Sequence, residues 1–137
     1  MLNILIVSSS RYPIKRKQIK ETIQKVLNTL KVTGFIEVEI SIVGDRKMTQ
    51  LHQKYMHEEG TTDVLSFPLH DNYIFTKAKQ KNESGFVDPD GILRLGSIVI
   101  SYPVAQKQAN EHNITTNEEV ARLVEHGMLH LLGIHHE

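Results

Sequence analysis

The sequence predicts an α+β fold, in which a small mixed β-sheet of about four strands packs with about four to five helices. In "FIEVEISIV", apolar residues alternate with polar ones from Ile36 to Ile42, which is the period of a strand with one buried face. Between Ile19 and Leu30, apolar residues recur every three or four positions, which is the period of an amphipathic helix. At 137 residues, one domain over residues 1–137 is expected.

The first half of the chain is expected to run strand, helix, strand, helix. The apolar run Leu2–Val7 is too short to cross a membrane and lacks the basic region of a secretory signal. We therefore interpret it as a buried strand of a cytoplasmic protein. Gly34 ends the first helical pattern, and Asp45 is expected to cap a second helix that runs through Tyr55.

The second half is expected to add two strands separated by a loop, and then two helices. "VLSF" forms a strand core that Pro68 ends, and Asp63 is expected to hydrogen-bond the backbone where this strand begins. Residues 69–94 are polar and contain the turn signal "DPDG", which indicates a loop or hairpin. "GSIVIS" predicts the next strand, and Ser101 then caps a helix with Pro103 in its first turn.

The last predicted helix has the clearest start and stop signals. Thr116 and Glu119 have the spacing of a capping box, in which the two residues satisfy each other's backbone N–H groups. Gly133 is a natural C-terminal stop, because glycine adopts the left-handed conformation that ends many helices. Apolar and small residues lie between them at helical spacing: Val120, Leu123, Val124, Gly127 and Leu131.

Composition narrows the classes of function. The chain has no cysteine, which excludes disulfides, thiolate zinc sites and cysteine nucleophiles. Its 16 basic and 16 acidic residues give a formal net charge of zero, which argues against a broad electrostatic surface for nucleic acid. A local basic patch is present in "RYPIKRKQIK", where cations at the start of a helix oppose its dipole and favour an anionic partner. The alternative is a solvated polar helix face.

Four of the eight histidines lie in the last twelve residues. His126 and His130 are about one helical turn apart, so their imidazoles can reach one ion at about 2.0–2.1 Å. His136 follows the break at Gly133, where a turned chain can bring a third imidazole to the same ion. Three neutral ligands leave a fourth position for water, which is the arrangement of a catalytic zinc, although nickel, cobalt and iron(II) are also compatible with such ligands.

The spacing H-x3-H-x2-G-x2-H is also that of the metzincin metallopeptidases. Those enzymes place a glutamate directly after the first histidine, where it acts as the general base. Here Gly127 occupies that position, and Glu125 is rotated about 100° around the helix in the wrong direction. A metzincin-like peptidase is therefore a disfavoured alternative, and Glu125 is expected to be a solvated charge.

Three blocks of the sequence occur in the order found in one known family. "HGMLHLLGIHH" resembles the signature H-G-x-L-H-L-x-G-[YF]-D-H of the YbeY family of bacterial rRNA maturation factors. "TTDVLSFP" resembles that family's block P-T-D-V-L-S-F-P. "LGSIVISYPVAQKQA" resembles its segment L-G-D-I-x-I-S-x-x-x-A-x-x-Q-A.

This resemblance implies a zinc-dependent, single-strand-specific endoribonuclease that matures the 3′ end of small-subunit rRNA and acts in ribosome quality control. It implies a YbeY-like metallohydrolase domain over residues 1–137, with one zinc ion per chain held by His126, His130 and His136. The implied partners are single-stranded RNA and the small ribosomal subunit or its associated proteins, with no DNA and no membrane. The RNA-contact candidates come instead from the basic patch described above, where cations gather at the start of the first helix: Arg11, Lys15, Arg16 and Lys20.

Three positions depart from the family pattern. Met56 stands where the family has an arginine thought to hold phosphate, which leaves no catalytic group assigned beyond metal-bound water. Ser97 and His135 stand where the family has aspartate. His135 is therefore an alternative third ligand, although motif spacing favours His136. A second function stays open, namely a ribosome-associated factor with a structural zinc and little catalysis.

Overall fold

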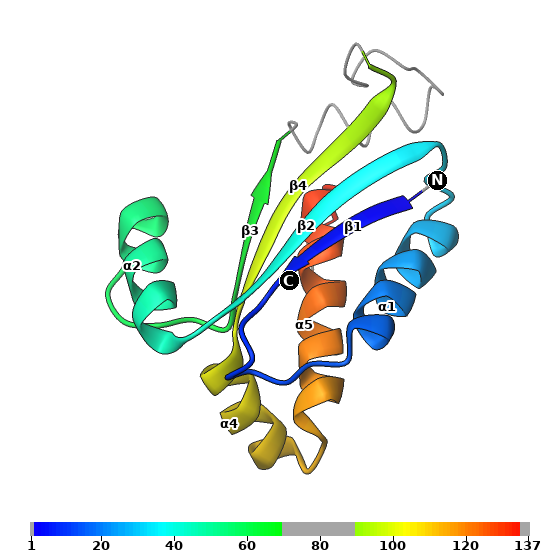
Figure 1. The fold of residues 1–137 in the computed structure, drawn as a ribbon. Coiled ribbons are helices and arrows are strands. Elements are labelled where there is room, and N and C mark those ends of the chain that lie inside the picture. Colours follow the sequence, from blue (N-terminus) through cyan, green and yellow to red (C-terminus); the bar gives the residue numbers. More distant parts are fainter. Residues whose placement is uncertain (1, 70–89, 135–137) are drawn as a thin grey trace.

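The computed structural model describes residues 2–69 and 90–134 (Figure 1). The predicted α+β fold is confirmed, with a four-stranded mixed sheet and four helices in the described ranges. The strands are β1 (Leu2–Val7), β2 (Phe35–Val43), β3 (Val64–Pro68) and β4 (Ile92–Ser101). The helices are α1 (Arg16–Thr29), α2 (Asp45–Met56), α4 (Tyr102–His112) and α5 (Thr116–Leu131).

The strands form one sheet in the order β1-β2-β4-β3. β1 and β4 both run parallel to β2, whereas β3 runs antiparallel to β4. The parallel pairing of β1 with β2 needs a crossover connection, and α1 provides it. This order places β3 at the edge of the sheet that is farthest from β1.

The two faces of the sheet are covered differently (Figure 1). α1 and α5 pack on one face with α4 at its end, and α2 covers part of the other face beside β3. The alternation in β2 explains the larger core, because Ile36, Val38, Ile40 and Ile42 are all buried toward α1 and α5. The smaller core, formed by Met48, Leu65 and Val99, lies beneath α2.

Two strand predictions need correction. The run Leu2–Val7 forms an edge strand rather than a buried one, and Leu5 and Val7 are half-exposed on its open face. An apolar run indicates a strand but does not tell which of its faces meets the core. The loop predicted over residues 69–94 ends earlier, because Ile92 already pairs with Phe35 of β2. Most of that loop lies outside the described residues.

α5 begins one residue earlier than predicted, because its capping residues have neighbours of the same type in Thr116 and Glu119. The capping box of α5 is formed by Thr115 and Glu118: Thr115 Oγ1 accepts the Glu118 N–H at 3.1 Å, and Glu118 Oε1 accepts the Thr115 N–H at 3.2 Å. The pairs in "TTNEE" satisfy the same spacing twice, so the sequence does not choose between them. The shift leaves Glu119 free to point toward the protein interior, where its side chain is buried.

The predicted N-cap is wrong for α2 and confirmed for α4. Gly44 is the N-cap of α2, and Asp45 is the first helical residue, whose Oδ1 accepts a hydrogen bond from Ser101 Oγ at 3.3 Å. Ser101 caps α4 as predicted, since its Oγ also accepts the Val104 N–H at 3.3 Å. None of the helices in the described ranges has the length and apolar character needed to span a membrane.

Replacing Thr115 by alanine is expected to lower the free energy of unfolding by about 1 kcal/mol, because it removes the cap of α5. Urea denaturation measures this change. Thr116→Ala is the matched control and should change stability by less than about 0.5 kcal/mol. A larger loss of stability in Thr116→Ala than in Thr115→Ala would mean that Thr116 is the N-cap.

Candidate metal centre

The helix that carries the histidines lies very close to the sheet. A Cβ atom at Gly127 would lie 2.8, 3.0 and 3.1 Å from three side-chain carbons of Ile98 in β4. The Gly127 carbonyl oxygen also accepts a hydrogen bond from Ser66 Oγ of β3 at 3.5 Å. Glycine at this position therefore allows α5 to pack closely on β4, and any side chain here would point into β4. A glutamate could not act there as a general base without displacing the helix.

His126 and His130 lie side by side on α5. Their ring centroids are 4.4 Å apart, with the ring planes inclined by 45°. Both side chains are only partly buried, and the ring of His126 forms no hydrogen bond with another described residue. Two imidazoles at this separation can each direct a nitrogen to one ion at about 2.0–2.1 Å. The predicted spacing thus brings the pair together, and metal binding by it stays a prediction.

The chain turns after α5 at the predicted glycine. Gly133 has a φ of +82°, and its N–H donates to the His130 carbonyl at 3.1 Å. The Ile134 N–H donates to the Leu129 carbonyl at 2.8 Å, which completes a Schellman motif. His136 and its alternative His135 lie outside the described residues, and the described ranges contain no group of three side chains suited to a metal ion.

Sequence reasoning missed an ion pair one turn before His126. Arg122 Nε and Nη2 donate to Glu119 Oε1 and Oε2 at 2.7 and 2.8 Å. The Glu119 side chain is fully buried, whereas that of Arg122 is 54% exposed. The hydrogen bonds to Glu119, helped by the charges of Glu119 and Asp63, raise the pKa of the Arg122 guanidinium despite its partial desolvation. The available signal was an acid and a base three residues apart on one helix.

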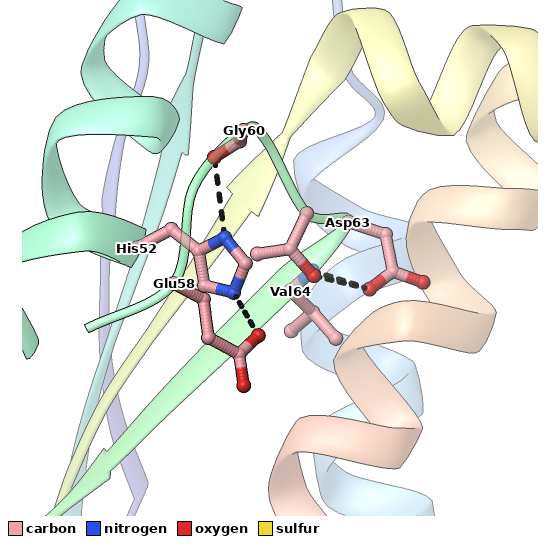
Figure 2. A network of polar contacts seen from close by, with 6 residues as sticks. His52, Glu58, Gly60, Asp63 and Val64 are labelled. Carbon is pink, nitrogen blue, oxygen red and sulfur yellow. Dashed lines mark hydrogen bonds and ion pairs between the residues drawn. The ribbon is translucent and has the colours of Figure 1, made fainter. Parts of the chain in front are cut away.

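Asp63 and its neighbours build the start of β3. Asp63 Oδ1 accepts the Val64 N–H at 2.7 Å (Figure 2), as predicted for the residue that begins this strand. Its Oδ2 accepts a hydrogen bond from Gln108 Nε2 at 3.3 Å, which links β3 to α4. The Asp63 carboxylate is therefore committed to structure.

His52 of α2 holds the segment between α2 and β3 (Figure 2). Its Nδ1 lies 3.2 Å from the Gly60 carbonyl oxygen, and its Nε2 lies 3.0 Å from Glu58 Oε2. Both ring nitrogens are engaged, so this buried histidine is a structural residue rather than a metal ligand. Met56, in the position of the expected arginine, is the exposed last residue of α2.

α1 packs beside a different face of α5 from the one that carries the histidine pair, so its basic residues do not line the site of the pair. Arg16 Nη1 donates to the Ile6 carbonyl at 3.0 Å and its Nη2 to Ser8 Oγ at 2.9 Å, so this side chain ties α1 to the end of β1. The groove between α1 and α5 is lined on α5 by Ala121, Arg122 and Glu125 among others, and by neither histidine. Glu125 is exposed, as expected for a solvated charge. The other RNA-contact candidates are also exposed: Arg11, Lys15 and Lys20.

Comparison with known proteins decides the family. The model of the family described as "Endoribonuclease YbeY" matches residues 5–137. The chain belongs to the YbeY family. The resemblance predicted from its three sequence blocks is therefore confirmed.

Curated YbeY relatives support this assignment along most of the chain. The "Endoribonuclease YbeY" of Frankia casuarinae is 40% identical over 111 residues, which are 81% of this chain and 52% of the relative. That of Moorella thermoacetica is 35% identical over 92% of this chain and 78% of its own length. The chain thus spans about half the length of the first relative and more of the second.

A solved structure shows the same fold. The solution structure of TM1509 from Thermotoga maritima matches with a TM-score of 0.58 and 23% identity. The match covers 100% of this chain and 75% of the other. At this identity the likeness concerns the fold, and it supports the arrangement of sheet and helices described above.

Proposed function

We propose that this YbeY-family chain is a metal-dependent endoribonuclease that cleaves single-stranded RNA. The observation that carries the proposal is the adjacent pair His126 and His130, whose ring centroids are 4.4 Å apart. The relatives' name supplies the reaction, which is cleavage of phosphodiester bonds within RNA. The proposed substrate is the 3′ end of small-subunit rRNA in the cytoplasm, with a further role in ribosome quality control.

The donor set suits zinc. Two neutral imidazoles on one helix face fit an ion that prefers nitrogen and sulfur ligands, and the chain contains no cysteine to supply sulfur. We assign His126 and His130 as two ligands of one zinc ion and His136 as the third, with His135 as the alternative. When bound, such an ion lowers the pKa of water to about 7 and polarises a phosphoryl oxygen.

The residues of this chain limit how the proton of the nucleophile can move. The position after His126 holds Gly127, whose Cα faces Ile98, so residue 127 supplies no carboxylate to accept that proton. The exposed carboxylate of Glu125 is on another side of α5. The nucleophile stays open between the RNA 2′-OH and water. The role of His126 and His130 is to hold and orient the ion.

The charge of the chain supports a ribosomal partner. Phosphate contacts supply most of the affinity of nonspecific RNA binding, and a chain with zero formal net charge makes few of them. We therefore propose that the small ribosomal subunit, or a protein bound to it, presents the RNA strand to this site.

Cleavage assays with zinc-loaded protein test the proposal. The substrates are a single-stranded RNA, a duplex of the same sequence and casein. Cleavage of the single strand alone, lost with EDTA and restored by zinc, is the expected result. Cleavage of casein would instead favour a peptidase. If no substrate is cleaved while the chain co-sediments with small ribosomal subunits, the structural-zinc factor replaces the endoribonuclease.

A further inference from the structure

We infer that Arg122 contacts a phosphate of the RNA strand beside the histidine pair. Arg122 lies one helical turn before His126, and His126 lies one turn before His130. Residues four apart on a helix are surface neighbours, with about 5–6 Å between their Cβ atoms, so the three side chains form a row along α5. The inference rests on the proposed function, because it assigns a substrate contact to the same site.

The guanidinium of Arg122 is held in one orientation. Both oxygens of Glu119 bind it, at 2.7 and 2.8 Å, and the Glu119 side chain is 0% exposed. A buried carboxylate cannot follow a mobile partner, so it fixes the plane of the guanidinium. An oriented cation binds an anion with less loss of side-chain entropy than a mobile lysine does.

The Arg122 guanidinium can still bind a ligand while it is paired with Glu119. The side chain is 54% exposed, and its Nη1 forms no hydrogen bond with another described residue. Guanidinium donors match the geometry of phosphate oxygens. Arg122 is also the only lysine or arginine in α5, so any cationic side chain that α5 presents beside the histidines has to be this one.

Two other arginines of the chain have guanidinium groups that are already engaged. The Arg16 guanidinium is engaged by the Ile6 carbonyl and Ser8. Arg94 on β4 is paired with Asp90 at 2.7 Å and with Glu37 at 3.6 Å. Neither lies on α5.

A purely structural role for Arg122 would be to neutralise Glu119, and the variants must separate the two roles. Removing Arg122 alone would leave a buried charge without its partner, which is destabilising. The variant E119Q/R122Q removes both charges together and so keeps the interior neutral. E119Q alone keeps the cation and removes its partner. R46Q removes an exposed arginine in the first turn of α2 and is the matched control.

The readout is binding of a short fluorescein-labelled oligouridylate by fluorescence anisotropy at several salt concentrations. EDTA-treated protein is used so that no RNA is cleaved, and urea denaturation confirms that each variant is folded. E119Q/R122Q should bind about tenfold more weakly than wild type, with a salt slope smaller by about 0.7, the value of one phosphate contact on a single strand. E119Q, which keeps the cation but loses the carboxylate that orients it, should bind with an affinity between those of wild type and the double variant, and R46Q should match wild type.

The outcomes separate this inference from the proposed function. If wild type and E119Q/R122Q bind equally and with the same salt slope, Arg122 is only the counter-ion of Glu119 and the inference is overturned. If E119Q weakens binding as much as the double variant, the loss stems from Glu119, which also overturns it. If wild-type protein binds no single-stranded RNA, with or without zinc, the inference is also overturned, whereas the proposed function is judged separately by the cleavage assay.

Discussion

A His130→Ala variant is expected to lose its bound zinc and, with it, the cleavage of single-stranded RNA. His130 is the middle member of the proposed ligand set, and its ring lies against that of His126. Loss of a hydrogen-bonding partner of a ligand already costs roughly 10- to 100-fold in metal affinity, so loss of the ligand itself should cost more. The zinc content should therefore fall from about one ion per chain to a small fraction.

Elemental analysis after dialysis against a weak chelator measures the zinc, and the cleavage assay measures turnover of the same samples. His112→Ala is the control, because His112 is an exposed histidine in the last turn of α4 and should leave both values unchanged. Equimolar zinc in the His130→Ala protein would remove this residue from the ligand set. Undiminished cleavage by that variant would point to a contaminating nuclease.

The parts of the fold that the sequence predicted are those set by local periodicity. The alternation in β2 and the three-to-four spacing in α1 directly reflect which face is buried, so these elements occur where they were expected. The histidine pair on α5 follows from the same rule, since residues four apart share a helix face. Each of these features depends on one element and not on its neighbours.

The features that could not be predicted depend on which residues of other elements, or of the same helix, pack against them. The run Leu2–Val7 is apolar, but its place at the sheet edge follows from strand order. Glu119 had the spacing of a capping residue, yet it is buried against Arg122, because the neighbouring Glu118 serves the cap equally well. Nor did the glycine after His126 indicate by itself that Ile98 lies beneath it.

Gly127→Ala is expected to destabilise the chain by about 1–3 kcal/mol, although alanine is the better helix former. The new Cβ would lie 2.8 Å from Ile98 Cγ2, closer than a Cβ atom can approach. Ile98 is fully buried and branched at Cβ, so its side chain has little freedom to move aside. The gain in helix propensity, about 1 kcal/mol, is therefore outweighed by the overlap. Ala121→Gly, in the same helix, calibrates the propensity alone.

A double-mutant cycle with Ile98→Ala tests whether this overlap is the cause. Ile98→Ala alone should cost about 2–5 kcal/mol, because it leaves a cavity. The double variant should be less destabilised than the sum of the two, because the added methyl group fills part of that cavity. Urea denaturation of the four proteins gives the coupling. Additive effects, or a Gly127→Ala protein more stable than wild type, would mean that α5 does not rest on β4 at this point.

Gly127→Glu tests whether the close packing of α5 on β4 also prevents peptidase activity. A glutamate at 127 would complete the metzincin arrangement in sequence, but its side chain would start toward Ile98 and bury a charge without a partner. The variant is expected to unfold at a lower urea concentration than Gly127→Ala and to gain no activity on casein. A folded, casein-cleaving Gly127→Glu protein would contradict this. Close contact between α5 and β4 thus excludes the peptidase's base, which leaves the proton of the nucleophile to be accepted by a group other than residue 127.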